Sequence, residues 1–275
     1  RDGDGGRPGG AGSVREALGT LELAYRCEEP LAAVLTARAM GEYNRGFRAL
    51  LQLRWARAAL SEAWERMRLL EGRFRAWRAG GRGADARALE EEAAGADGAW
   101  DAGAVPAWAD TPESERRELL RRLHRLELFR HEMNHFVAAL EGFVLGQLEG
   151  GAREGLRRGL AAARDLRGVA RAHGAYVSAA LRCCFLGAEF RAASDFVAAI
   201  LQRAVDLQAL CRAHPGLSLA RGETPWRKVQ ALHLSFKNTA HLLFRLLRAA
   251  RHPQLAELGL LLDPTAFYGF PASAA

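Results

Sequence analysis

Apolar residues recur at steps of three and four positions along most of this chain, which is the spacing of one face of an α-helix. The pattern is longest over residues 40–77 and 119–148, and no proline interrupts either stretch. Thr36 is a suitable N-cap for the first stretch, and Thr111, which precedes a proline, is suitable for the second. The first stretch also places Trp64 among its buried residues. These stretches predict two long amphipathic helices.

Shorter stretches with the same spacing follow. Gly150 and Gly151 predict a break, Asp165 is placed to start another helix, residues 188–213 form a further one, and Pro225 opens the last long helix. No run of β-branched residues alternates between apolar and polar positions in the way that a strand requires. The chain is therefore predicted to be all-α, a bundle of long antiparallel helices.

Two segments depart from the helical pattern. Residues 1–19 are rich in glycine and are predicted to be a disordered linker. Residues 79–110 begin with three glycines in five positions and continue with a cluster of acidic residues, which predicts a flexible, disordered acidic insertion. We therefore expect one helical domain over residues 20–275, interrupted by this insertion. The chain begins with Arg1 rather than with methionine, so we expect it to be part of a longer protein.

The charge balance is basic, with a formal net charge of +7. All but two of the 39 basic residues are arginine, the exceptions being Lys228 and Lys237, and alanine and glycine are also abundant. This composition is typical of coding bias in a GC-rich genome, so the charge alone does not indicate a nucleic-acid partner, and no nucleic-acid-binding motif is present. The positive charge is also compatible with a protein partner that has an acidic surface. No apolar run approaches the length of about 18 residues that spans a bilayer, so no membrane insertion is expected.

The four cysteines, at positions 27, 183, 184 and 211, form no CxxC pair. They are best explained as free thiols in a reducing compartment, which favours the cytoplasm. No glycine-rich phosphate loop is present, and His173 and Tyr176, one helical turn apart, are more typical of core packing than of acid–base catalysis. We expect no cofactor and no metal.

The sharpest catalytic pattern is an HExxH string at His131, Glu132 and His135. On a helix the two imidazoles would share a face and could hold zinc, while the carboxylate would activate a water molecule. The extended form of the motif wants histidine at position 141, where Glu141 stands, and the chain has no predicted sheet edge to align a peptide. A zinc metallopeptidase is therefore an alternative to a binding function, as is a generic helical adaptor.

Four segments, taken in order, resemble the C-terminal region of the gamma-tubulin complex components. They are LELAYRCEEPLAAVLT followed by YNRGFRALLQLRWARAAL, then LFRHEMNHFVAALEGFV, then DLRGVARAHGAYV, and finally LHLSFKNTAHLLFRLL followed by LLLDPTAFY. Each motif alone is degenerate, but their order and spacing over residues 20–270 are specific. The HExxH string falls inside the second segment, so the resemblance explains it as a coincidence within a family helix.

This resemblance implies an all-helical domain that binds gamma-tubulin, works with other gamma-tubulin complex components, and is not an enzyme. It also implies a place in the cytoplasm, on the cytoskeleton, at microtubule-organising centres and spindle poles. It leaves open which member of the family this is. As partner-binding residues we expect Lys237 and Asn238 on the last long helix, with Phe267 and Tyr268 beyond it. The two aromatic residues have an equally simple alternative role, which is to pin the C-terminus to the core.

Overall fold

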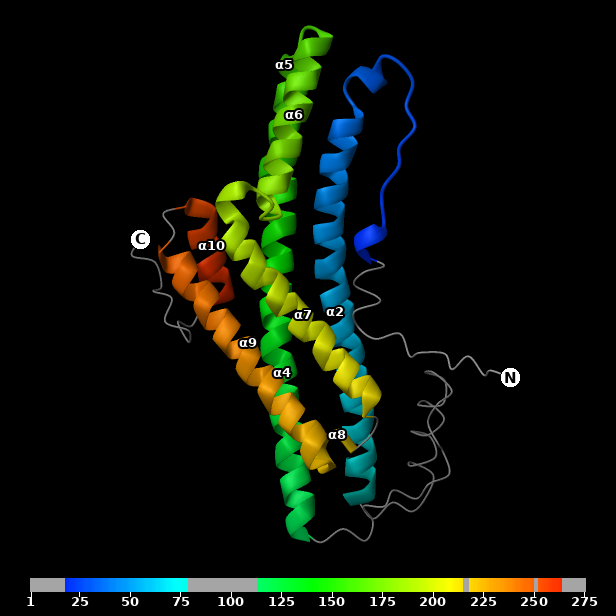
Figure 1. Cartoon of the computed structure of the whole chain (residues 1–275), viewed down its shortest axis with the longest axis vertical. Helices are drawn as coiled ribbons and strands as arrows, with labels where there is room; N and C mark the ends of the chain where they lie inside the picture. Colours follow the sequence, from blue (N-terminus) through cyan, green and yellow to red (C-terminus); the bar gives the residue numbers. More distant parts are fainter. Residues whose placement is uncertain (1–17, 79–112, 215–217, 250–251, 264–275) are drawn as a thin grey trace, which may run out of the picture. The chain divides into compact units, whose positions relative to one another are not determined.

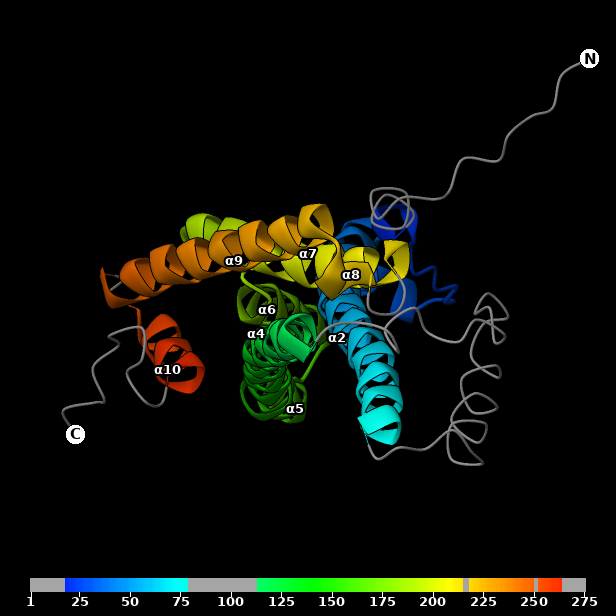
Figure 2. The same ribbon diagram turned by 90° about the horizontal axis from the view of Figure 1, so that it is seen from below.

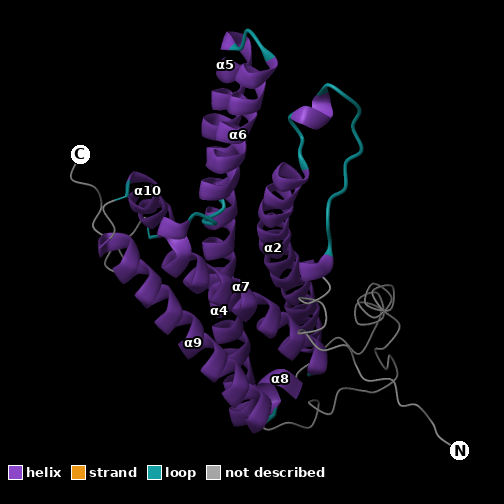
Figure 3. Ribbon diagram, turned by 45° about the horizontal axis from the view of Figure 1, so that its top comes forward, coloured by secondary structure: helices purple, strands orange, loops and turns teal. Residues whose placement is uncertain are grey.

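The computed structural model describes residues 18–78, 113–214, 218–249 and 252–263. Every regular element within these ranges is helical (Figures 1 and 3), so the prediction of an all-α helical bundle is confirmed. Of the predicted linker, only Leu18 and Gly19 are described, and both are helical. The predicted acidic insertion, residues 79–110, lies outside the described ranges.

Four long helices dominate: α2 (Ala37–Arg78), α4 (Glu113–Gly146), α7 (Arg191–Ala213) and α9 (Glu223–Ala249). The shorter elements are η1 (Leu31–Ala33), η2 (Gln147–Ala152), α5 (Arg153–Ala162), α6 (Leu166–Cys183), η3 (Ala188–Phe190), α8 (Ser218–Arg221) and α10 (Pro253–Leu262). In the part of the chain that is described, no helix has the length and apolar character of a membrane span.

Two of the predicted N-caps are confirmed by their hydrogen bonds. The backbone N–H of Ala39 donates to Oγ1 of Thr36 over 3.2 Å at the start of α2. The backbone N–H of Gly168 donates to a carboxylate oxygen of Asp165 over 2.6 Å at the start of α6. Each bond satisfies one of the backbone donors that a helix leaves without an intrahelical partner.

The break predicted at Gly150 and Gly151 is wrong. The chain stays helical from Glu113 to Ala162, because α4 passes through the π-helical turn η2 directly into α5. The backbone N–H of Arg153 donates to the carbonyl of Leu148, five residues earlier, which is the wider hydrogen bond of a π-turn. The two glycines therefore lie inside a locally widened helix rather than at its end.

The buried position predicted for Trp64 is also wrong, since this side chain is 43% exposed. The buried face of α2 in this region instead follows Leu60, Ala63 and Met67. Trp64 is the next residue after Ala63 and so points about 100° away from that face. There the guanidinium of Arg68 lies over the indole ring, 5.1 Å from its centroid, so the ring is shielded by a cation–π contact rather than by the core.

The chain divides into two compact units. Unit 1 comprises residues 1–57, 134–205 and 235–275, and unit 2 comprises residues 58–133 and 206–234. In the core of unit 1, Phe136 of α4 meets Phe236 of α9 edge to face, with ring centroids 6.1 Å apart. In unit 2, the buried ring of Phe129 lies 4.4 Å from the half-buried ring of His233.

Within unit 1, α5 and α6 form a hairpin whose helices run side by side in opposite directions (Figure 1). Their closest approach is at Gly159, where an added Cβ would lie only 2.8 Å from the Cβ of Ala172. The same unit contains α10, which follows the C-terminal end of α9 as a separate short helix (Figure 2). The ring of His252, at the start of α10, packs edge-on against Phe190, 4.8 Å between centroids.

Candidate partner-binding surface

The described ranges hold no group of three or more His, Cys, Asp or Glu side chains that could share a metal ion. Within the HExxH string, His131 and His135 are both exposed on α4. The carboxylate of Glu132 lies 3.3 Å from Nε2 of His233. The group that would have to activate a metal-bound water therefore contacts the half-buried imidazole of His233 in unit 2.

The thiols of Cys183, Cys184 and Cys211 are buried and free. Burial raises the pKa of all three, to about 12 for Cys184 and for Cys211. At neutral pH these thiols are protonated, and a protonated thiol is a poor nucleophile and a poor metal ligand. These three cysteines are best explained as small apolar core residues.

The other polar cluster is a hydrogen-bonded pair in unit 1. The hydroxyl of Tyr43 on α2 lies 2.9 Å from Nε2 of His173 on α6. Burial lowers the pKa of His173 and raises that of Tyr43, so both groups are neutral at pH 7. They stand beside a groove of about 220 Å³ whose lining is apolar apart from Glu42 and the tyrosine hydroxyls. Cys184 also lines the groove, but its thiol is protonated at neutral pH. The hydrogen bond between Tyr43 and His173 joins α2 to α6.

The surface that stands out instead is the exposed face of α9 within unit 1. Asn238, His241, Leu242, Arg245 and Arg248 are exposed and follow one another at steps of one or three residues. Leu242 keeps 45% of its surface accessible to water. Neither arginine makes a hydrogen bond or ion pair with another described residue. The face thus presents an apolar centre with cations around it.

The opposite side of the same helix segment is held firmly in the core of unit 1. Phe236, Ala240, Leu243, Phe244 and Leu247 are each at most 1% exposed. Burying a Phe or Leu side chain contributes about 1.5–3 kcal/mol. The apolar spacing of this segment therefore determines which side chains point outward, and α9 presents them from a rigid backbone.

The sequence leaves this region without negative charge, since no aspartate or glutamate occurs between Glu223 and Glu257. A face with cations and no carboxylates complements an acidic partner and repels a basic one. The exposed side chain of Leu242 adds apolar surface that a partner can bury, and the centres of protein interfaces are usually apolar.

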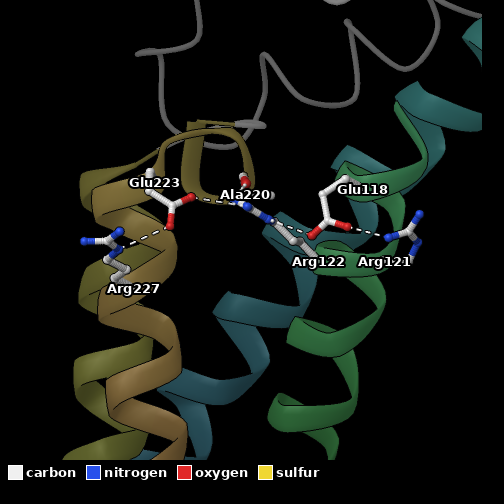
Figure 4. A network of polar contacts seen from close by, with 6 residues as sticks. All are labelled: Glu118, Arg121, Arg122, Ala220, Glu223 and Arg227. Atoms are coloured by element: carbon white, nitrogen blue, oxygen red, sulfur yellow. Dashed lines mark hydrogen bonds and ion pairs between the residues drawn. The ribbon is translucent and has the colours of Figure 1, made fainter. Parts of the chain in front are cut away.

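The start of α9 lies in unit 2, where a network of charged side chains holds it (Figure 4). Arg122 of α4 donates to the carbonyl of Ala220 over 3.0 Å and to Glu223 over 3.2 Å, and it also pairs with Glu118. Arg227 donates to the same Glu223, and these hydrogen bonds, first from Arg227 and then from Arg122, lower the pKa of Glu223. These contacts join α4, α8 and the first turn of α9, so we assign the network a structural role.

The residues expected from sequence to bind a partner fall into three groups. Asn238 lies on the exposed face of α9, whereas Lys237 is half-buried and already interacts with another residue. Phe267 and Tyr268 lie outside the described residues. Sequence reasoning missed His241, Leu242, Arg245 and Arg248, although their spacing from Asn238 and the absence of nearby acidic residues are readable in the sequence.

Comparison with known proteins places the chain in a family. A family model described as Gamma tubulin complex component C-terminal matches residues 11–268, which is nearly the whole chain. The mouse protein Gamma-tubulin complex component 5 is 25% identical over 252 residues, which cover 89% of this chain and 22% of the mouse protein. The chain thus spans less than a quarter of that relative's length. Because the family model covers so much of it, this chain belongs to the gamma-tubulin complex component family, in which it corresponds to the C-terminal region.

Proposed function

We propose that this chain binds gamma-tubulin as a non-catalytic scaffold and positions it for microtubule nucleation. Its other partners would be further components of the gamma-tubulin complex. Its place would be the cytoplasm, at microtubule-organising centres and spindle poles. The observation that carries the proposal is the exposed face of α9 in unit 1, in a chain of this family. There Leu242 lies on the same face as Arg245 and Arg248, which have no partner among the described residues.

The chemistry of that face suits a protein partner with an acidic surface. Arginine presents a planar fork of donors that matches carboxylates, and unpaired arginines at the rim of an interface speed association and fix its orientation. Arg245 and Arg248 would supply this rim, and Leu242 the desolvated centre. Asn238 lies on the same face and adds a hydrogen-bonding amide.

The test is a pull-down of purified gamma-tubulin by this chain at about 50 and about 200 mM salt. We expect saturable binding that weakens at the higher salt, because the distance over which exposed charges are screened falls from about 14 Å at about 50 mM to about 7 Å at about 200 mM. Replacing Arg245 and Arg248 together by glutamate should weaken binding at least about tenfold, which corresponds to about 1.4 kcal/mol. The matched control is the same double replacement at Arg38 and Arg191, two exposed arginines in the first turns of α2 and α7, which should leave binding within about twofold.

Four outcomes would count against the proposal. If a folded, helical sample does not retain gamma-tubulin, gamma-tubulin is not the partner of this chain. Equal losses in both double variants would mean that net charge, rather than the α9 face, drives binding. One zinc ion per chain in the same preparation would favour the metallopeptidase alternative. In a nucleation assay the chain alone should inhibit or have no effect, and stimulation would contradict the scaffold role.

The remaining expected contacts need their own variants. Truncating a true interface anchor to alanine costs about 2 kcal/mol or more of binding energy. We propose this outcome for Phe267→Ala and Tyr268→Ala, and smaller losses for Lys237→Ala and Asn238→Ala. If the aromatic variants bind normally but melt at lower temperature, those side chains pin the C-terminus to the core instead.

A further inference from the structure

The tip of the α5–α6 hairpin exposes arginine and leucine side chains together. Between residues 153 and 171 the exposed arginines are Arg153, Arg157, Arg158, Arg164, Arg167 and Arg171. Leu160 and Leu166 flank the turn between the helices and keep 42% and 46% of their surfaces exposed. This tip belongs to unit 1, but none of its residues is part of the α9 face.

The only two carboxylates in this stretch are already engaged. Glu154 pairs with Arg157 at 2.9 Å and approaches Arg158 at 3.9 Å. Asp165 accepts the hydrogen bond that caps α6. Local acidic residues therefore do not neutralise the rest of the tip.

The other four arginines of the tip have no such pairing. Arg153, Arg164, Arg167 and Arg171 make no hydrogen bond or ion pair with any residue in the described ranges. Coding bias accounts for a high arginine content, but it does not account for arginines without a described partner in the same hairpin as two exposed leucines, with Arg167 directly after Leu166. This arrangement offers both charge and apolar contact to a ligand.

The hairpin presents these side chains from a fixed backbone. Gly159 lets α5 and α6 approach so closely that a Cβ there would lie 2.8 Å from that of Ala172. The carboxylate of Asp165 fixes the turn by capping α6. A ligand that docks on the tip would therefore not have to order it first, which lowers the entropic cost of binding.

We propose that the α5–α6 tip binds an extended acidic peptide segment in which apolar side chains alternate with carboxylates. Clusters of arginine are a recurrent means of recognising acidic motifs, because each guanidinium can hold a carboxylate through two parallel hydrogen bonds. The two leucines can pack against the apolar side chains of this peptide. A purely polar anion has no side chains that could make this contact. The proposal is independent of gamma-tubulin binding by the α9 face.

Two other anionic ligands fit the tip less well. Single-stranded nucleic acid is usually held by aromatic side chains on which bases stack, and residues 153–171 contain none. A helix that lies on a membrane needs a whole apolar face turned to the lipid. Here α5 packs closely on α6 at Gly159 and Ala172, and the large apolar side chains exposed in this stretch are those of Leu160 and Leu166.

The test uses two fluorescein-labelled peptides and the full chain, with binding followed by fluorescence anisotropy. One peptide has four repeats of Glu-Glu-Phe, and the other has four repeats of Glu-Glu-Ser with the same charge. We expect the phenylalanine peptide to bind at least about threefold more tightly, because only it can use the exposed leucines. The Arg164→Glu/Arg167→Glu variant should bind it about tenfold more weakly, whereas the Arg38→Glu/Arg191→Glu control should stay within about twofold of the parent chain.

A second variant separates apolar contact from charge. Leu160→Ser/Leu166→Ser should lower the affinity for the phenylalanine peptide to that for the serine peptide, while the affinity for the serine peptide stays the same. Both leucines are half-exposed, so the variant should keep its circular dichroism spectrum and melting temperature. Failure of this variant to change the preference between the peptides would overturn the proposal.

Three further results would also overturn it. The first is an equal loss of peptide affinity in the tip and control variants, and the second is that neither peptide binds. The third is that the peptides do not bind while phosphatidylserine vesicles or single-stranded DNA do, in a way that depends on the tip arginines. Loss of gamma-tubulin binding is a separate outcome, because it is read from the α9 variants and not from the tip.

Discussion

Replacing Glu62 by glutamine tests whether an ion-pair network stabilises unit 2. The carboxylate of Glu62 on α2 accepts a hydrogen bond from Nε of Arg212 over 2.6 Å and one from Nε of Arg66 over 3.0 Å, and it also accepts from the buried amide of Gln208. These bonds, first that from Arg212, lower the pKa of Glu62 from 4.5 to about 2. The charged form of Glu62 is thus favoured by folding.

The size of the effect follows from that pKa. One pKa unit corresponds to about 1.4 kcal/mol, so the shift sets an upper limit of about 3 kcal/mol. A quarter of the Glu62 side chain remains exposed, and half of that of Arg212, so solvent screening reduces the contribution to about 1–2 kcal/mol. Glu62→Gln should therefore lower the free energy of unfolding by about 1–2 kcal/mol at pH 7.

The pH dependence gives the prediction its sign. Because the pKa is lower in the folded chain, the unfolded chain takes up the proton first as the pH falls. The contribution of Glu62 is fully present above pH 4.5 and is lost as the pH falls toward about 2. The difference in stability between the parent chain and the Glu62→Gln variant should shrink over the same interval.

Urea unfolding followed by circular dichroism at pH 7, pH 5 and pH 3 measures that difference. Other carboxylates titrate in both proteins, so their effects cancel in the comparison. Glu65→Gln is the matched control, because Glu65 is exposed on the same helix and has no ion pair with another described residue. A difference below about 0.5 kcal/mol at pH 7, or one that stays constant down to pH 3, would refute this account of the network.

Two further predictions concern unit 1. Gly159→Ala should destabilise the α5–α6 hairpin by about 1–2 kcal/mol, because the new methyl group would meet Ala172 at 2.8 Å. At Gly155 an added Cβ would meet nothing within 4 Å, so Gly155→Ala should instead stabilise the helix by about 0.5–1 kcal/mol. Thermal melts in which the two variants shift the melting temperature in the same direction would contradict the close approach at Gly159. Tyr43→Phe should cost about 1 kcal/mol at pH 7 by removing the hydrogen bond to His173. The pKa of His173 is lowered from 6.5 by burial, so its contribution to stability is present above pH 6.5 and is lost as the pH falls through the folded pKa, which urea titrations at pH 7.5 and pH 5.5 would detect.

The sequence predicted those parts of the fold that depend on local chemistry. Thr36 and Asp165 cap helices because a side-chain oxygen at that position satisfies a nearby backbone donor. The spacing of apolar residues over 119–148 predicted an amphipathic helix, and two of these residues, Met133 and Leu140, are indeed buried on α4. Such features follow from a few neighbouring residues and need no knowledge of the rest of the chain.

Features that depend on packing between distant segments could not be predicted in this way. α6 ends with Phe185 in the left-handed conformation, φ 59°, a position that usually carries glycine. The N–H of Leu186 donates to the carbonyl of Leu181 and closes the helix. The ring of Phe185 stacks on Phe143 and meets Phe190 edge-on, so tertiary packing holds a backbone conformation that local propensity disfavours.

The candidate surfaces show the same limit. From the sequence, the high arginine content could be attributed to coding bias. A count of arginines does not show which of them already form ion pairs within the fold. The structure separates the two kinds: Arg54 pairs with Glu141 at 2.8 Å, while Arg164 and Arg245 have no partner among the described residues. A paired arginine contributes to the fold, whereas an unpaired one beside an exposed leucine has its full charge and hydrogen-bonding capacity available to a partner. The position of the unpaired arginines, on one face of α9 and at the tip of the α5–α6 hairpin, is therefore more informative about binding than the net charge of +7, and charge reversal at each of these two places is the experiment that tests it.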